Sequence, residues 1–157
     1  MRNRLKGTTL VETVLYIAIL TTILFVIVSF TLSTSEATMR TERRAHVYSA
    51  SEFITQHLDY IFSRATGINE TKSSFNQDNG MLYINIGNEE HYYSLSSNKL
   101  VYDGTEMNTK DILIKKFHAV PVHNKKEKVV GVRVTLEIES LRDQKVKKEV
   151  NTLYTVR

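Results

Sequence analysis

The chain has 157 residues, no cysteine and a formal net charge of +4 at pH 7. This length fits one membrane helix and one domain of about 90 residues, and the absence of cysteine excludes a disulfide-stapled outer domain. Residues 1–7 carry three positive charges, residues 36–104 sum to about −3 and residues 105–157 to about +5, so the high pI is largely a topology signal and not a nucleic-acid signature.

The first predicted element is a basic leader followed by an apolar helix. The leader's charges are Arg2, Arg4 and Lys6, and no residue in the range 13–35 is charged. The apolar core of this run, residues 10–32, spans roughly 34 Å at about 1.5 Å per residue, enough for the ~30 Å hydrocarbon layer. Because the basic residues precede it, we expect a single-pass protein in the cytoplasmic membrane with its N-terminus inside and its C-terminal domain outside.

One carboxylate, Glu12, lies in the first turn and a half of this helix. A charge inside a hydrocarbon-length segment costs roughly 2.5 to 3.5 kcal/mol on insertion scales. Such a residue is retained for a function, so Glu12 is the first candidate site residue.

The leader ends in a small residue, Gly7, and Glu12 stands at position five if Thr8 is the first residue of the mature chain. Residues 1 to about 35 therefore resemble the start of type IV prepilins and type II secretion pseudopilins. The resemblance implies that a prepilin peptidase cleaves between Gly7 and Thr8 and N-methylates Thr8. It also implies that Glu12 acts in assembly.

Two positions depart from common members of that family. Thr8 stands where phenylalanine is frequent, and Ser29 stands where many major pilins have a proline that lets the helix melt locally in the filament. The pair Thr21-Thr22 is only a mild weakener of the helix.

Two other interpretations compete with this one. A secretory signal peptide has an apolar region of about 7–15 residues and an A-x-A-like site, whereas this run is longer and continues into helix. An uncleaved single-pass anchor explains the hydrophobicity but gives no reason for Glu12 or for Gly7 before it.

From Glu36 onward the pattern becomes amphipathic. Apolar positions and one histidine recur at steps of three and four: Ala50, Phe53, Ile54, His57, Leu58, Ile61, Phe62 and Ala65. Gly67 follows as the expected C-cap. We predict one helix over about residues 9–66, with His46 and His57 as packing or solvated residues and not ligands.

After Gly67 the period changes to that of strands. We predict strands at 81–86, 90–95, 100–102, within 112–122, at 129–140 and at 146–156. Gly87-Asn88, Ser96-Ser97-Asn98 and the stretch 141–145 are the expected turns, and Asp103-Gly104 ends the third strand. Alternation is clearest in residues 129–140, which predicts a half-buried strand with one wet face.

The order of elements predicts an α+β fold, in which a long N-terminal helix packs on one C-terminal antiparallel sheet. Its expected parts are a leader (1–7), a transmembrane segment (8–35), an amphipathic continuation (36–66) and a β-rich domain (67–157). Tyr92-Tyr93-Ser94-Leu95, Leu100-Val101-Tyr102, Phe117 and the terminal strand pair make residues 81–157 similar to J-type minor pseudopilins. The resemblance implies a pilin-like fold.

No nucleotide loop, zinc-protease motif, redox motif or nucleophile elbow is present, so we expect no enzyme, catalytic residue, metal or cofactor. Residues 76–80 offer oxygens to calcium but lack the EF-hand spacing, and we interpret them as a turn. Asn69-Glu70-Thr71 fits a glycosylation sequon of low specificity. The basic residues Lys115, Lys116, Lys125, Lys126, Lys128, Lys145, Lys147 and Lys148 could attract nucleic acid if clustered, but solvated sheet edges are the favoured reading.

The predicted function is that of a minor pilin or pseudopilin, a structural subunit that assembles through its N-terminal helix into a type IV pilus or type II secretion pseudopilus. The resemblance implies the prepilin peptidase, other pilin or pseudopilin subunits, the membrane platform of the assembly machinery and the lipid bilayer as partners. The alternative is a membrane-tethered extracellular binding module, for example for DNA during uptake.

Overall fold

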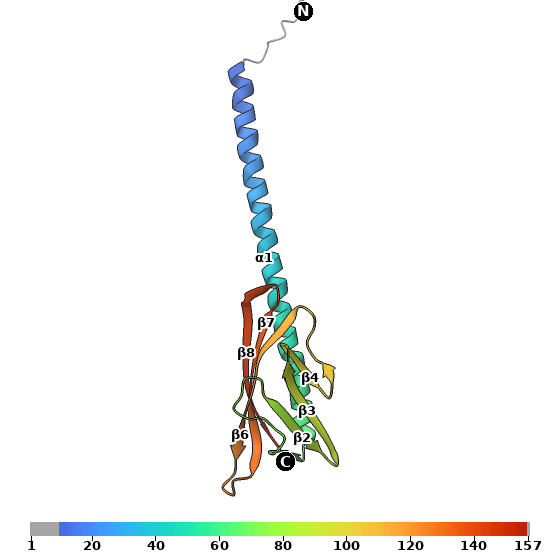
Figure 1. Cartoon of the computed structure of the whole chain (residues 1–157). Helices are drawn as coiled ribbons and strands as arrows, with labels where there is room; N and C mark the ends of the chain where they lie inside the picture. Colours follow the sequence, from blue (N-terminus) through green and yellow to red (C-terminus); the bar gives the residue numbers. More distant parts are fainter. Residues whose placement is uncertain (1–9, 157) are drawn as a thin grey trace, which may run out of the picture. The chain divides into compact units, whose positions relative to one another are not determined.

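The computed structural model describes residues 10–156 (Figure 1). The chain separates into two compact units, one extending as far as Arg40 and the other beginning at Thr41. Helix α1 (Leu10–Arg64, 55 residues) supplies the described part of the first unit and the beginning of the second. The predicted long helix is therefore confirmed, with bounds within two residues of those expected.

The end of α1 differs from the prediction. Gly67 does not adopt the left-handed conformation of a C-cap, because the glycines with positive φ among the described residues are Gly87 and Gly104. Gly67 instead opens strand β1 (Gly67–Ile68). The Thr66 N–H donates to the carbonyl of Asn85 at 2.8 Å, so strand pairing follows the last helical turn directly.

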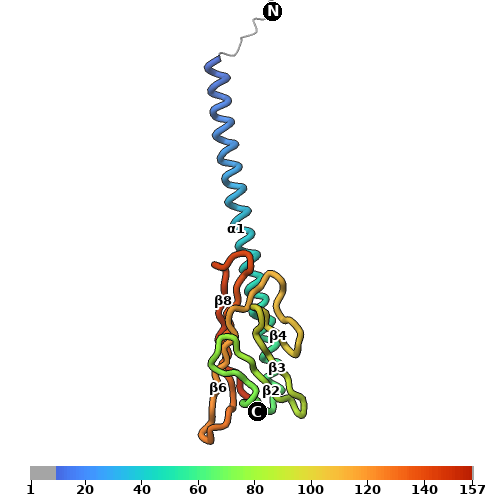
Figure 2. The backbone as a smooth tube through the Cα atoms, viewed as in Figure 1, coloured from blue at the N-terminus to red at the C-terminus, as the bar shows by residue number. Residues whose placement is uncertain are grey.

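The strands form two antiparallel sheets, where the sequence predicted one. Sheet A has the order β1-β2-β3-β4-β5 and sheet B the order β6-β7-β8, and each is a meander (Figures 1 and 2, green to yellow and orange to red). Their bounds are β2 (Met81–Ile86), β3 (Glu89–Ser96), β4 (Lys99–Tyr102), β5 (Thr105–Glu106), β6 (Ile112–His123), β7 (Val129–Ser140) and β8 (Asp143–Thr155). The α+β class is thus correct, and the division into two sheets is a correction to it.

Three tight turns set the register of sheet A. Gly87-Asn88 joins β2 to β3, and Ser97-Asn98 joins β3 to β4 with φ values of 51° and 63°. Asp103-Gly104, with φ values of 46° and 83°, ends β4 as predicted and leads into the two-residue strand β5. In the second and third of these turns both central residues have positive φ, which gives a turn twist that matches the flanking strands.

The core of the second unit lies between α1 and both sheets. The α1 residues that it buries are Val47, Ser51, Ile54, Leu58, Ile61 and Phe62. His57 reaches sheet A, where its Nδ1 lies 2.6 Å from the hydroxyl of Tyr93, and the Phe62 ring stacks on Tyr154 of sheet B at 4.7 Å. The predicted amphipathic face is therefore used by both sheets.

Phe53 corrects that prediction at one position. It was expected on the packed face but is 54% exposed, whereas its neighbour Ile54 is fully buried. Consecutive helical residues point about 100° apart at 3.6 residues per turn, so a stripe centred on Ile54 and Leu58 leaves Phe53 at its edge.

Candidate functional site

Of the candidate site residues, only Glu12 lies within the described part of the chain, which begins at Leu10. Gly7 and Thr8, the expected cleavage and methylation positions, lie outside the described residues. Glu12 is in the first turn of α1, half-exposed, and accepts a hydrogen bond from the Tyr16 hydroxyl at 3.0 Å. An acidic group in a first turn interacts favourably with the helix dipole, so Glu12 also suits the helix that carries it.

The apolar half of α1 has no cover within the described chain. Every large hydrophobic side chain in the range 10–32 is between 49% and 82% exposed. This helix is the one candidate span among the described residues, long and apolar enough to cross a membrane by length and composition. Its side chains need either lipid or other helices around them.

Threonine hydroxyls in this half are satisfied within the helix. Thr21 and Thr22 donate to the carbonyls of Ile17 and Ala18 at 2.7 and 2.9 Å. Thr31, Thr34 and Thr38 make the same bond to the residue four positions earlier. Back-bonding of this kind removes the hydroxyl from the surroundings, which suits a helix in hydrocarbon.

A cluster of aromatic rings joins α1 to sheet A. The His57 ring meets Tyr102 edge-on at 4.6 Å, and the His91 ring stacks on the same tyrosine at 5.8 Å. Burial lowers the pKa of His57, and the nearby Asp103 carboxylate opposes that shift. Burial also raises the pKa of Tyr93. A neutral His57 therefore packs here, as the interpretation of it as a packing residue expected.

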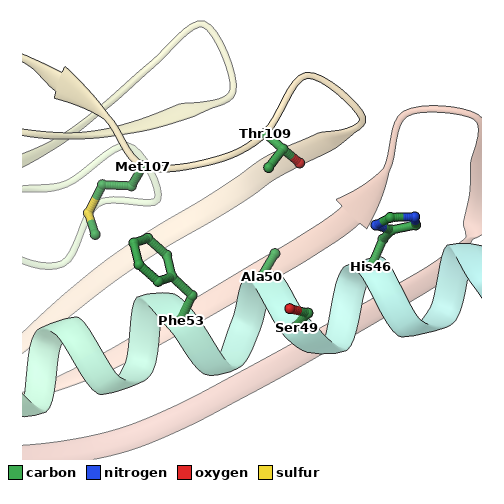
Figure 3. Close-up of a pocket in the computed structure, with 6 residues that line it drawn as sticks. All are labelled: His46, Ser49, Ala50, Phe53, Met107 and Thr109. Carbon is green, nitrogen blue, oxygen red and sulfur yellow. The ribbon is translucent and has the colours of Figure 1, made fainter.

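Two grooves run beside α1 in the second unit. The first has a volume of about 390 Å³, and Figure 3 shows the residues that line it. Its lining is His46, Ser49, Ala50, Phe53, Met107 and Thr109. The second, of about 370 Å³, lies between α1 and β8 and is lined mostly by polar and charged residues, among them Glu52, Asp59 and Glu149.

The turn at residues 76–80 is occupied by the protein's own groups. The Asp78 carboxylate lies 3.2 Å from the Lys116 ammonium and 2.9 Å from Nδ1 of His118. The hydrogen bond from Lys116 is the main cause that lowers the pKa of Asp78. Nowhere in residues 10–156 do three or more His, Cys, Asp or Glu side chains come together as a group able to hold a metal.

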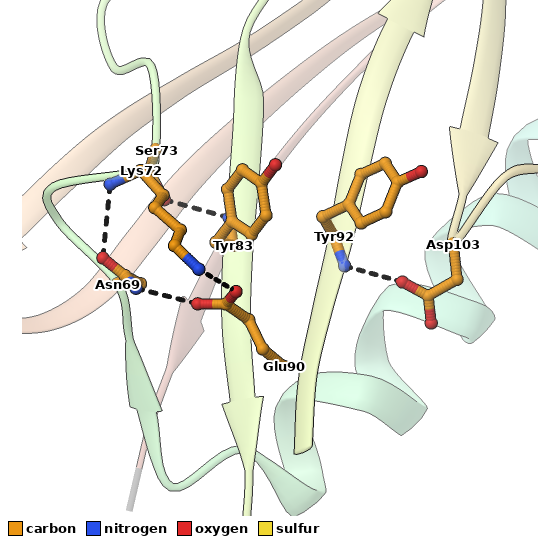
Figure 4. A network of polar contacts seen from close by, with 7 residues as sticks. All are labelled: Asn69, Lys72, Ser73, Tyr83, Glu90, Tyr92 and Asp103. Atoms are coloured by element: carbon orange, nitrogen blue, oxygen red, sulfur yellow. Dashed lines mark hydrogen bonds and ion pairs between the residues drawn. The ribbon is translucent and has the colours of Figure 1, made fainter. Parts of the chain in front are cut away.

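Asn69 of the sequon is also engaged (Figure 4). Its amide donates to Glu90 Oε1 at 2.8 Å, and its Oδ1 accepts the Lys72 N–H at 3.2 Å. Lys72 completes the network by pairing with Glu90 Oε2 at 2.5 Å, while the rings of Tyr83 and Tyr92 stack beside it. This is a cross-strand arrangement that stabilises the sheet.

The eight lysines singled out in the sequence do not form one surface. Lys116 pairs with Asp78, Lys147 with Glu137 at 3.2 Å, and Lys148 lies over the Tyr48 ring. Lys115 lies within β6, and Lys125, Lys126 and Lys128 gather in the turn between β6 and β7. Lys145 lies near the start of β8, at the other end of β7. The twelve residues of β7 separate these ends by roughly 36 Å at 3.3 Å per residue.

No protein-family model, curated protein or solved structure matches this chain. The residues themselves therefore carry the functional argument. Sequence reasoning missed both grooves, because each combines an exposed helix edge with a loop or strand more than fifty positions away. The one signal in the sequence for the second groove was that Glu52 and Asp59 lie beside the apolar positions of α1.

Proposed function

We propose that this protein is a minor pilin or pseudopilin, a membrane-anchored subunit that is cleaved by a prepilin peptidase and assembles through α1 into a filament. One observation carries the proposal. A single helix supplies an exposed apolar stretch with the lone carboxylate Glu12 near its start, and the same helix continues as the packed core element of a folded domain. An anchor alone needs the first feature but not Glu12.

Glu12 has a specific task in this proposal. Cleavage after Gly7 leaves the amine of Thr8 as a cation, and an unpaired charge away from water is strongly unfavourable. The Glu12 carboxylate of the same or a neighbouring subunit supplies the anion.

Processing is tested by the intact mass of protein extracted from the membrane of a host with the peptidase. The expected chain begins at Thr8, with or without one methyl group, and replacement of Gly7 by a large residue leaves the leader attached, because a side chain obstructs the scissile bond. A native chain beginning at Met1 would end the proposal.

Assembly is tested by crosslinking between transmembrane helices. We expect Glu12→Leu and Glu12→Gln to insert, to be cleaved and to accumulate normally, yet to lose helix–helix crosslinks. The glutamine still accepts the Tyr16 hydrogen bond and removes only the charge, so it separates charge pairing from local helix structure. Glu36→Leu, which removes an exposed acid just beyond the apolar stretch, is the matched control. Equal crosslink yield in all variants would remove Glu12 from the mechanism.

A membrane-tethered module that binds DNA is the competing proposal. It is favoured by the exposed lysines of the β6–β7 turn, since phosphate contacts dominate nucleic-acid affinity. DNA retention by the purified protein that falls steeply with salt and with the loss of those lysines would support it.

A further inference from the structure

The groove between α1 and β8 is acidic. Glu52 and Asp59 of α1 and Glu149 of β8 line it, and Lys148 is its single base. The Lys148 ammonium lies 4.4 Å from the centroid of the Tyr48 ring, which holds that charge toward one side. Ser51, Thr55 and Gln56 add hydroxyl and amide groups, and Val150 completes the lining. The groove thus offers acceptors to a cationic group.

A basic turn of opposite charge lies elsewhere on the same unit. Lys125, Lys126 and Lys128 are exposed in the β6–β7 turn, and within residues 10–156 none of the three forms an ion pair. Asn124 fixes the turn, because its Oδ1 accepts the N–H groups of Lys126 at 2.8 Å and Lys128 at 3.1 Å. The lysines are therefore presented from an ordered backbone.

The turn of one molecule cannot reach Glu149 in the groove of the same molecule. Glu149 pairs with Glu137 in the middle of β7, whereas the turn precedes Val129 at the end of that strand. Eight residues of strand separate the two positions by roughly 26 Å at 3.3 Å per residue, well beyond the reach of a lysine side chain. The lysines of the turn therefore do not pair with Glu149 of their own molecule.

We propose that the β6–β7 turn of one copy docks in the α1–β8 groove of a second copy. The turn carries three lysines and Glu127, and the groove three carboxylates and Lys148, so net charges of +2 and −2 face each other. The two patches are different surfaces, so the contact is head-to-tail, and repeating it without closure gives a helical filament. The inference rests on the proposed function, in which this contact links neighbouring domains.

The contact is too small to hold two free molecules together. A single turn in one groove is expected to bury less than the roughly 1,200 Å² of a stable interface. It forms when membrane helices keep the domains at high local concentration, and it weakens with salt because the charges lie near solvent.

Cysteine crosslinking in the full chain tests the contact, because the native protein has no cysteine. Gln56→Cys marks the groove and His123→Cys marks the turn without removing a carboxylate or a lysine. In membranes of the producing cell, a chain with both cysteines is expected to give a ladder of dimers, trimers and larger species, and each single variant only monomers. Closed dimers without a ladder contradict a head-to-tail contact.

Charge reversal then tests its chemistry. In the double-cysteine chain, Lys125→Glu with Lys126→Glu, or Asp59→Lys with Glu149→Lys, should lower the ladder at least roughly tenfold, since like charges face each other. Combining both pairs should restore it. Lys110→Glu, at an exposed lysine outside the turn, is the matched control, and an unchanged thermal transition shows that each variant is folded.

A second cysteine series separates this inference from the proposed function. A single cysteine in the apolar half of α1, at Leu32, reports helix assembly. Helix crosslinks without the ladder overturn the turn–groove contact alone, and loss of both overturns the contact together with the proposed function. If the lysine variants keep the ladder but lose binding to DNA or to anionic vesicles, the turn is a phosphate-binding surface and the inference is wrong.

Discussion

The two halves of α1 belong to one helix but differ in what surrounds their apolar side chains. In residues 10–32 every large hydrophobic side chain is exposed, and threonine hydroxyls turn back onto the helix itself. From Thr41 to Arg64 a stripe that includes Ile54 and Leu58 is fully buried by two sheets, and His57 bonds to another element. The apolar side chains of the first half can be covered only by lipid or by other molecules, whereas those of the second half are covered by their own domain.

This difference separates the part of α1 that acts in folding from the part that acts in insertion or assembly. The second half can be judged as a folding element, because its partners are residues of the same chain. The large hydrophobic side chains of residues 10–32 are not covered by any other part of residues 10–156, so the role of the first half depends on lipid and on other helices. Substitutions should therefore affect stability in one half and insertion or assembly in the other.

The largest effect is expected from Phe62→Asp. Phe62 is 3% exposed and stacked on Tyr154, so the variant loses a core ring and buries a charge, at a cost of about 3–5 kcal/mol. We expect a fragment of residues 36–157 to be soluble and folded, and its Phe62→Asp variant to be unfolded by circular dichroism at room temperature.

Phe53→Asp is the matched control on the same helix. Because Phe53 is 54% exposed, its replacement should change the free energy of unfolding by no more than about 0.5–1 kcal/mol. Equal destabilisation by both variants would mean that the buried stripe is placed wrongly.

An Ile23→Asp change in the apolar half should act on insertion instead. Aspartate at the centre of a membrane helix costs about 2.5–3.5 kcal/mol on insertion scales, so less of the full chain should resist extraction from membranes by alkaline carbonate. Ile23→Leu should behave as the parent. The thermal transition of the second unit should be unchanged, and a shift in it would contradict the independence of the two halves.

A smaller effect is expected from pH on the second unit. The pKa of His57 is lowered from its usual 6.5, so the unfolded chain binds this proton more readily than the folded one. The stabilisation is complete above about pH 6.5 and is lost as the pH falls through that value toward the lower folded-state pKa.

Urea unfolding of the 36–157 fragment at about pH 7.5 and 5.5 measures this loss. The dependence should shrink in His57→Gln. The carboxyl groups of Asp78 and Glu90 have lowered pKa values, and their contributions are lost only near and below about pH 4. An identical pH dependence in the variant would show that His57 does not report on the α1–sheet A contact.

The smallest effect is expected for Thr22→Val. The Thr22 hydroxyl donates to Ala18 of its own helix, so removing it costs no contact with another molecule and should change stability by less than about 0.5 kcal/mol. Insertion and helix crosslinking should match the parent. A loss of crosslinks would instead indicate that this hydroxyl bonds between helices.

Particular residues show which parts of the fold the sequence predicted correctly and which it did not. The alternation of Val130, Val132, Val134, Leu136 and Ile138 predicted β7, and all of them except the partly exposed Val130 are buried. Gly87-Asn88 predicted the β2–β3 turn. Gly67 was expected to cap α1 because glycine tolerates the left-handed conformation, but pairing with Asn85 made it a strand residue. Strands as short as β1 and β5 have no period of their own and exist only through their partners.

The candidate site was predictable to an uneven degree. Glu12 stands out in the sequence because a charge in an apolar run is costly wherever the helix lies. The acidic groove does not, since Glu52 and Glu149 become neighbours only when β8 lies beside α1. The Lys125–Lys128 stretch was recognised as basic, but Asn124 as the residue that orders it was not.

By itself the sequence determined the elements whose cause is local: the apolar helix, its amphipathic continuation, the alternating strands and the tight turns. Periodicity, turn chemistry and hydrophobic length act within a few residues, so they can be read along the chain. Only the tertiary structure decided that the strands divide into two sheets, that Phe53 stays exposed while Phe62 is buried, and that acidic and basic surfaces lie apart. Those outcomes depend on which distant segments meet, because burial and charge pairing are properties of contacts and not of residues taken singly.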